Sequence, residues 1–260
     1  MRTLIAAIQE AERRKIAIGH FNFANLEQLK AIAHVGMRLN VPVIIGVSEG
    51  EREYLGVHHV RDLIDSHNKE HARTGGFQLF LNADHTKSLE KAREAVVNGF
   101  DAVLFDGSKL SLDENITQTK EAVRAVTRGW KFWQKNVLVE GELGYIGGAS
   151  EIREGIPEGA VMKPEDLTKP EDAVRFVRET GVNLLAPAVG NIHGMLARQS
   201  PKGDGGYAGS DAPLDIARIK AIKDAVKIPL VLHGASGNTD EDLRAAIDAG
   251  ISIVHISTEL

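Results

Sequence analysis

Gly99-Phe100-Asp101-Ala102-Val103-Leu104-Phe105-Asp106 is a glycine followed by a short apolar run, and it identifies the repeating unit of the chain. Glycine is the residue that best adopts the left-handed conformation after a helix, and the run that follows has the length of one strand. The same order recurs at Gly181–Ala188 and Gly250–Ser257. Two further runs, Val41–Ile45 and Ile228–Leu232, have proline at their second position, where it can only open a strand.

The whole chain contains eight such runs, and we expect each to be a strand: Ile16–Phe21, Val43–Val47, Gln78–Leu81, Ala102–Phe105, Val137–Leu143, Leu184–Val189, Leu230–His233 and Ile253–Ser257. The runs are almost continuously apolar, as in parallel strands that are buried on both faces. Apolar residues at helical spacing lie between them, in Leu26–Leu39, Leu89–Asn98, Asp113–Thr127, Glu171–Thr180, Asp215–Val226 and Asp240–Ala249, and an opening helix over about Thr3–Arg13 precedes the first strand. Such alternation allows a closed barrel or an open doubly wound sheet, and eight strands favour the barrel. We therefore predict an α/β fold, a TIM (β/α)8 barrel, as a single domain over residues 1–260.

The chain stops at Thr258-Glu259-Leu260, directly after the last expected strand. No residues remain for the final helix that completes a barrel of this kind. We therefore expect a truncated sequence, or a partner chain that covers the flank of the last strand.

Length and composition agree with one barrel, at 260 residues and 43% hydrophobic content. The net charge of -5 and the lack of a basic stripe argue against a nucleic-acid partner. We find no signal peptide and no apolar run of about 18 residues that would enter a membrane. The absence of cysteine excludes disulfides, thiolate zinc ligands and cysteine nucleophiles. These features predict a cytoplasmic protein.

Four polar signatures follow expected strands: Asn82-Ala83-Asp84-His85, Glu140-Gly141-Glu142-Leu143-Gly144, Gly190-Asn191-Ile192-His193-Gly194 and His233-Gly234-Ala235-Ser236-Gly237. The C-terminal ends of barrel strands converge on one mouth, so we expect these residues to face one cavity. His85, His193 and His233 come from three strands, and three imidazoles with an open fourth position are typical of a catalytic zinc site. For each histidine alone, a simple hydrogen-bonding role is the alternative.

Other polar segments have plainer interpretations. His67-Asn68-Lys69-Glu70-His71 matches the H-x-x-E-H pattern of zinc proteases, but its flanks are polar and we interpret it as a solvated helix end. Glu49-Gly50-Glu51-Arg52-Glu53 is interpreted as a solvated helix start with acidic residues favoured by the helix dipole. Tyr145–Lys169 and Met195–Pro213 are long enough to be lids or binding loops.

A phosphate site is expected where the last two strands end. His233–Asp240 places glycines, hydroxyls and backbone amides directly before a helix, whose N-terminus attracts anions. Ser257-Thr258 supplies the second half, because the loops after strands seven and eight of such barrels often bind one phosphate together. Ordinary N-capping by Asn238 or Thr239 is the alternative.

These residues resemble the class II, metal-dependent, fructose-bisphosphate and tagatose-bisphosphate aldolases. The resemblance runs from Ile18-Gly19-His20-Phe21-Asn22 to the last residue, and the motifs that carry it occur in the family's order and approximate spacing: Ala83-Asp84-His85, Glu142-Leu143-Gly144 with Gly147-Gly148, Asn191-Ile192-His193-Gly194 and His233-Gly234-Ala235-Ser236-Gly237. It implies a lyase of carbohydrate metabolism and glycolysis. This enzyme would cleave a ketose 1,6-bisphosphate, fructose 1,6-bisphosphate above others, to dihydroxyacetone phosphate and glyceraldehyde 3-phosphate.

The resemblance also implies roles for individual residues. Zn²⁺ would be held by His85, His193 and His233, and a second divalent metal, or the zinc in another position, by Asp106 and Glu142. Asp84 would protonate the aldehyde oxygen during condensation. The sugar phosphate would be contacted by Asn22, Ser48, Gly194, Gly234, Ser236, His255, Ser257 and Thr258, with a monovalent cation near Gly194. The implied partners are a small sugar phosphate and further copies of the chain, as a homodimer or homotetramer.

Two positions depart from the family pattern. The family's acidic catalytic base lies on the loop after Gly147-Gly148, where this chain reads Ala149-Ser150-Glu151, so Glu151 is the candidate base although it comes one residue late. His255 stands at the last strand, where the family usually has asparagine.

The chemistry expected of this site removes a proton beside a ketone and so creates an enediolate, whose charge a divalent ion offsets as a Lewis acid. No expected strand presents a lysine at its mouth end, which fits a metal in place of a Schiff base. Three alternatives stay open: an aldolase for tagatose 1,6-bisphosphate or a related sugar phosphate, a hydrolase that uses zinc-bound hydroxide, and a non-catalytic sugar-phosphate-binding relative.

Overall fold

The computed structural model describes residues 2–71, 75–127, 137–144, 152–153, 167–191, 195–197, 207–208, 214–236, 238–258 and 260. Eight parallel strands close into a barrel in the order β1-β11-β10-β7-β5-β4-β3-β2. These strands are β1 (Ile18–Asn22), β2 (Pro42–Val47), β3 (Gln78–Thr86), β4 (Ala102–Phe105), β5 (Leu138–Leu143), β7 (Leu184–Pro187), β10 (Leu230–Leu232) and β11 (Ile251–Ile256). The predicted TIM barrel is therefore confirmed, and the open sheet is excluded.

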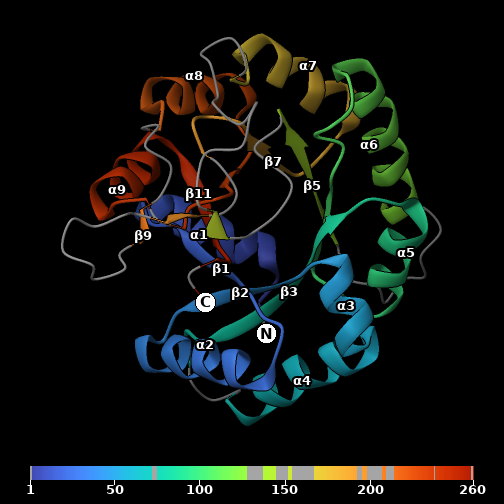
Figure 1. The fold of residues 1–260 in the computed structure, drawn as a ribbon, viewed down its shortest axis with the longest axis vertical. Helices are drawn as coiled ribbons and strands as arrows, with labels where there is room; N and C mark the ends of the chain where they lie inside the picture. Colours follow the sequence, from blue (N-terminus) through green and yellow to red (C-terminus); the bar gives the residue numbers. More distant parts are fainter. Residues whose placement is uncertain are drawn as a thin grey trace.

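Helices ring the strands in Figure 1, apart from α1, which lies behind the centre of the barrel. Within the described residues the helices are α1 (Leu4–Arg14), α2 (Leu26–Leu39), α3 (Glu49–Leu55), α4 (Val57–Glu70), α5 (Leu89–Val97), α6 (Leu112–Thr127), α7 (Pro170–Thr180), α8 (Ile216–Val226) and α9 (Asp240–Ala249). The seven helices whose ranges were predicted are all present. Their ends differ from the prediction by at most one residue. No helix in the described part of the chain is long and apolar enough to span a membrane.

The helix end expected at His67–His71 is the end of α4, whose full range was not predicted. Lys69 and Glu70 are exposed as expected, but the expectation that no face of this helix is buried is wrong. The helix buries Val60, Ile64 and Asn68 against the barrel. The Asn68 side chain donates to the carbonyl of Leu79 and accepts from its N–H, both at 2.8 Å. The pairing of β3 with β4 begins only at Asn82, so the backbone groups of Leu79 on that side have no strand partner. The Asn68 side chain provides their hydrogen bonds instead.

A second, small sheet has the order β6-β8-β9. Its strands are β6 (Ile152–Arg153), β8 (Met195–Ala197) and β9 (Tyr207–Ala208). They fall within the two segments that we predicted to be long loops. Strands β6 and β8 pair in parallel and β8 and β9 pair antiparallel, so the two segments are joined by backbone pairing.

The lower half of the barrel interior is apolar and closed. Each barrel strand contributes at least one buried residue to one apolar cluster, called the apolar layer below, and these residues include Ile18, Ile44, Phe80, Ala102, Leu138, Leu184, Val231 and Ile253. Helix α1 packs Leu4, Ala7, Ile8 and Ala11 against that layer. Because this helix plugs the N-terminal end of the barrel, the polar interior opens at the C-terminal ends of the strands.

Candidate active site

Buried polar side chains fill the barrel directly above the apolar layer. Residues two apart on a strand point to the same side, so the next inward positions after the apolar layer can be read from the sequence. They include His20, Asn82, Glu140, His233 and His255, all buried. The sequence analysis placed Asn82 and Glu140 in signatures expected to face the cavity, but it gave no role to them or to His20. The signal was present, since each stands two residues before a residue that was identified, namely Asn22, Asp84 and Glu142.

Strand β3 contains an irregularity that turns two consecutive side chains into the site. The register with β4 shifts between Ala83 and Thr86, and His85 has a φ of 37°, in the left-handed region. In a regular strand Asp84 and His85 would point to opposite faces, whereas a bulge re-aims one of them. A non-glycine residue held at positive φ is strained, and such strain concentrates at functional sites.

Arg52 of α3 supports this irregular segment. Its guanidinium donates to the carbonyls of Val47 at 2.6 Å and Asp84 at 3.2 Å, and to the Thr86 hydroxyl at 3.1 Å. The residue is only 2% exposed, so the interpretation of the Glu49–Glu53 cluster as solvated is wrong for Arg52. A buried cation with these three acceptors ties the ends of β2 and β3 together.

His85 lies between carboxylates on neighbouring strands. Its Nδ1 is 3.1 Å from Asp106 Oδ2 and 3.5 Å from Glu142 Oε2. Burial alone would lower the pKa of His85, but the charges of Asp84, Glu142 and Asp106 raise it to about 10. Burial raises the pKa of Glu142 to about 7, against the opposing charge of His85. Burial alone would raise the pKa of Asp106. Hydrogen bonds from His85 and Ser108, together with the charge of His85, hold it well below its usual value.

A chain of hydrogen bonds fixes the protons on the other histidines. The Asn22 amide group donates to Asp84 at 3.0 Å and Glu51 at 3.1 Å, so its Oδ1 must accept from His255 Nε2 at 2.8 Å. His255 Nδ1 is then an acceptor, and it lies 2.9 Å from His233 Nδ1. His233 Nε2 is 2.8 Å from Glu140 Oε1. The pattern therefore assigns protons to both nitrogens of His233.

The pKa directions agree with this assignment. Burial lowers the pKa of His233, but the hydrogen bond and charge of Glu140 outweigh it and raise the pKa overall. Burial and the neighbouring His20 hold the pKa of His255 well below 6.5. Burial also lowers the pKa of His20 to about 4. These directions agree with a proton on each nitrogen of His233 and with an unprotonated Nδ1 on His255.

Asp84 is the carboxylate shared by both sides of the site. Its Oδ2 accepts from Asn22 and lies 3.6 Å from His255 Nε2. Burial alone would raise the pKa of Asp84, but the surrounding histidines, His255 and His85 foremost, hold it well below its usual value. The side chain is therefore a buried carboxylate ready to accept a proton or to bind a cation.

The donor set fits a divalent transition metal. Two groups each bring three ligand atoms within 4.8 Å of one another: Asp84, His85 and His233 in one, and His85, Asp106 and Glu142 in the other. Neither carboxylate oxygen of the buried Glu142 accepts a hydrogen bond from the described residues. Such a carboxylate is costly unless a cation compensates it, and imidazole with carboxylate is a usual ligand set for zinc.

Zinc affinity should rise steeply with pH, because the metal must displace the proton of His85. With a pKa of about 10, this imidazole is cationic at pH 7. Because one proton must leave His85, each pH unit below that value lowers the apparent zinc association constant about tenfold, so the constant should rise at least about tenfold per unit from pH 7 to 9. Competition titrations with a chromophoric chelator measure it. A constant that does not change over this range would contradict the assigned proton.

Glu140 should act on the metal through His233. Because Glu140 Oε1 orients the ring and accepts from Nε2, Glu140→Gln should weaken zinc binding by about 10 to 100-fold. The exposed Glu121 of α6 offers the matched control, and Glu121→Gln should leave zinc affinity unchanged. Equal affinity of Glu140→Gln and the control would show that Glu140 does not position His233.

The expected phosphate loops lie side by side. Ser257 N–H donates to Ser236 Oγ at 3.4 Å, and Ala235 N–H donates to the His255 carbonyl at 3.2 Å. The helix itself is capped by Thr239 and has three acidic residues in its first turn, so its own N-terminus does not favour an anion. The capping alternative is therefore correct for Thr239, and a phosphate would be held by the loops before it.

Other predicted residues have varied placements. Ser48 caps α3 in a capping box with Glu51, which uses its hydroxyl inside the protein. Glu151, His193 and Gly194 lie outside the described residues. His67, Glu70 and His71 do bring ligand atoms within 4.8 Å, on a half-buried to exposed surface at the end of α4, near the start of β3 and not at the C-terminal strand ends.

The comparisons with known proteins give one consistent result. The family model described as "Fructose-bisphosphate aldolase class-II" matches residues 2–260. A fructose-bisphosphate aldolase of Geobacillus stearothermophilus is 34% identical over 97% of this chain and 79% of its own length. One from Giardia intestinalis is 35% identical over 90% of this chain but only 65% of its own length. The crystal structure of the YdjI aldolase of Escherichia coli K12 has a TM-score of 0.76 at 29% identity, covering 100% of this chain and 82% of that one.

Proposed function

Because this chain belongs to the class II fructose-bisphosphate aldolase family, we propose that it is a zinc-dependent aldolase that reversibly cleaves fructose 1,6-bisphosphate. The products would be dihydroxyacetone phosphate and glyceraldehyde 3-phosphate. The observation that carries the proposal is the pair of metal-ligand groups that share His85 at the mouth of the barrel. The sequence places a third histidine, His193, after β7, and we propose it as a further zinc ligand.

In this proposal His85, His193 and His233 hold the ion, with Asp106 and Glu142 as ligands of a second ion or of an alternative position. The bound ion would supply Lewis-acid stabilisation of the negative charge that develops on the substrate oxygens during cleavage. The half-buried carboxylate of Asp106 and the buried carboxylate of Glu142 lie beside His85 Nδ1 and hold its ring in place. Glu140 does the same for His233 from the other side.

Asp84 carries the proton transfer at the substrate oxygen. Its low pKa makes it a carboxylate, so in the cleavage direction it can accept the hydroxyl proton as the carbon bond breaks. The same group returns that proton to the aldehyde oxygen during condensation, because the two directions share one pathway. Glu151 remains our candidate for the base that removes the proton beside the ketone.

Polar groups around the mouth of the barrel would position the substrate. Gly194, Gly234, Ser236, Ser257 and Thr258 would bind the phosphate, with a monovalent cation nearby. The contact between Ser257 and Ser236 supports this, since it brings the two loops together. Asn22, Ser48 and His255 would contact the rest of the substrate. A homodimer or homotetramer, a cytoplasmic location and a role in glycolysis stay predictions.

A coupled assay on fructose 1,6-bisphosphate tests the proposal, with tagatose 1,6-bisphosphate in parallel. We expect release of dihydroxyacetone phosphate from both sugars and faster release from fructose 1,6-bisphosphate. Faster cleavage of the tagatose compound would identify the alternative aldolase. Release of inorganic phosphate without triose phosphates would identify a hydrolase, and binding without turnover would identify a non-catalytic relative.

A further inference from the structure

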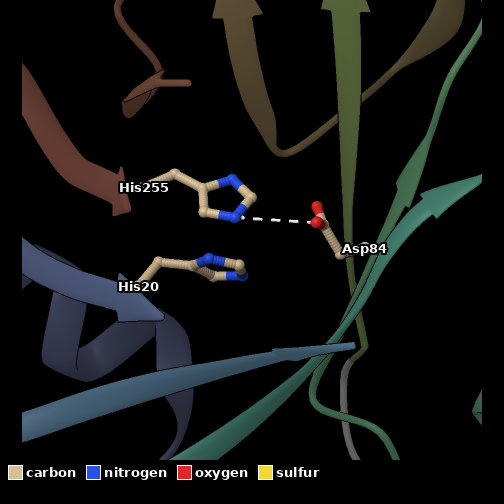
Figure 2. Close-up of side chains that lie close together, drawn as sticks. All are labelled: His20, Asp84 and His255. Atoms are coloured by element: carbon tan, nitrogen blue, oxygen red, sulfur yellow. Dashed lines mark ion pairs between the residues drawn. The ribbon is translucent and has the colours of Figure 1, made fainter. Parts of the chain in front are cut away.

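A further group of metal ligands is more completely buried than the two groups described above. His20 of β1, Asp84 of β3 and His255 of β11 bring one ligand atom each within 4.8 Å of one another. Figure 2 shows both imidazoles directed toward the carboxylate of Asp84, one ring above the other. The ring centroids of His20 and His255 are 3.9 Å apart. All three side chains are buried, with 1 to 4% exposure.

Hydrogen bonding accounts for some polar atoms of this group but not for all of them, since His20 Nε2 lies 3.1 Å from the side-chain nitrogen of Asn82. His20 Nδ1 and Asp84 Oδ1 are buried and have no hydrogen-bond partner among the described residues. Burying a polar atom without a partner costs free energy, so two such atoms in one cluster need an explanation. A bound cation would provide one, because imidazole nitrogen and carboxylate oxygen are both ligands of zinc and similar ions.

The distances suit such an ion. His255 Nε2 lies 3.6 Å from Asp84 Oδ2 and 2.8 Å from Asn22 Oδ1. Tetrahedral coordination at zinc bond lengths of about 2.0 to 2.1 Å places ligand atoms about 3.4 Å apart. An ion that replaces the Nε2 proton of His255 would therefore meet the oxygens of Asp84 and Asn22 with small movements of the side chains.

Gly46 makes room for this arrangement. A Cβ atom at this position of β2 would collide with both His20 Cε1 and Asn22 Oδ1. Any larger residue would thus push the ring and the amide out of the interior. Because Gly46 has no side chain, the side chains of His20 and Asn22 on β1 occupy the space in front of β2.

We propose that His20, Asp84 and His255 form a second, inner binding site for a divalent transition-metal ion of the zinc class, with Asn22 Oδ1 as a further oxygen ligand. This inner site is distinct from the Asp106 and Glu142 position, because it shares no residue with that group. Asp84 belongs to both the inner site and the His85–His233 group, so its two carboxylate oxygens can join them. The proposal does not depend on aldolase activity.

The test uses a background in which the expected catalytic site is removed. His85→Ala with His193→Ala breaks both other buried groups at the mouth of the barrel. We would add Co²⁺ to this metal-free double variant, remove unbound ion by gel filtration, and measure the cobalt content and the visible absorption. We expect about one Co²⁺ per chain, and we expect Zn²⁺ to displace it.

The decisive comparison is between two triple variants, each of which adds one more substitution to the double variant. Adding His20→Ala should weaken Co²⁺ binding by more than about 100-fold, since even outer partners of a metal site contribute 10 to 100-fold. Adding His71→Ala, which removes a ligand from the surface group on α4, should change nothing. Circular dichroism checks the fold of each variant, and His20→Gln replaces His20→Ala if the latter unfolds.

Three results would overturn the inner site. The first is that the double variant binds no Co²⁺. The second is that Co²⁺ binding stays unchanged after His20→Ala or His20→Gln is added, and the third is that only the addition of His71→Ala removes it. Anomalous diffraction at the cobalt edge from crystals of the double variant gives an independent answer, because it locates the ion beside His20, Asp84 and His255 or elsewhere. Loss of aldolase activity in the same variants has no bearing on any of these readouts.

Discussion

His85→Ala should lower kcat/KM for fructose 1,6-bisphosphate by at least about 10³-fold. The substitution removes the one histidine that the two metal groups at the mouth have in common. Lewis-acid stabilisation by a bound ion is worth several kcal/mol of transition-state charge, and about 4 kcal/mol corresponds to about 10³-fold in rate. Zinc content of the purified variant, measured together with activity, should fall as well.

His71→Ala is the matched control for this loss. His71 also belongs to a group of three metal-ligating side chains, but that group lies on α4 and not at the strand ends. We expect its activity and zinc content to equal those of the unsubstituted chain. Equal losses from both substitutions would mean that the catalytic metal is assigned to the wrong histidines.

Asp84→Asn should lower kcat by about 10² to 10⁴-fold, which is the usual contribution of a positioned acid or base. Asparagine keeps the size of the side chain and can still contact Asn22 and His255, but it cannot carry a proton between oxygen atoms. We therefore expect a smaller change in KM than in kcat. Initial rates over a range of substrate concentrations separate the two parameters.

The matched control is the same substitution at the exposed Asp62 of α4. Asp62→Asn should leave kcat and KM unchanged. If Asp84→Asn raised KM and kept kcat, Asp84 would only bind substrate. If the pH profile of kcat kept the same acid limb in the variant, that limb would belong to another group.

The barrel could be predicted because each unit of the chain repeats the same order of helix, cap and apolar strand. Strand β4 (Ala102–Phe105) and helix α2 (Leu26–Leu39) have the predicted bounds, since their neighbours mark the ends clearly. Asn40, in the left-handed conformation after α2, is such a mark. Residues that follow strands were expected to face the mouth, and the structure brings Asp84, His85 and His233 together there.

Other features depend on tertiary contacts that the sequence pattern does not reveal. The apolar run predicted that this strand ends at Leu81, but β3 continues to Thr86. Its bulge keeps the polar residues Asp84 and His85 in the barrel wall. Arg52 is buried because backbone carbonyls at the ends of β2 and β3 accept its hydrogen bonds. Asn68 interrupts the apolar face of α4, yet it is buried because it pairs with the edge of β3.

The polar interior could have been found and was missed for a simple reason. His20 lies inside an apolar run that reads as strand core, and Glu140, although it opens a polar signature, was given no role because the family motif begins two residues later at Glu142. Period-two spacing places them in the barrel interior, where neighbouring polar groups share their burial. The site therefore has two levels, the mouth that motifs identify and a buried layer that only the strand geometry identifies.

The most direct measurement is cleavage of fructose 1,6-bisphosphate before and after removal of metal by a chelator, and again after zinc is added back. We predict that chelation abolishes release of dihydroxyacetone phosphate and that zinc restores it, because the histidines and carboxylates at the strand ends act through a bound ion. Cleavage that persists in the fully metal-free protein would contradict a metal-dependent aldolase and the site assigned to it.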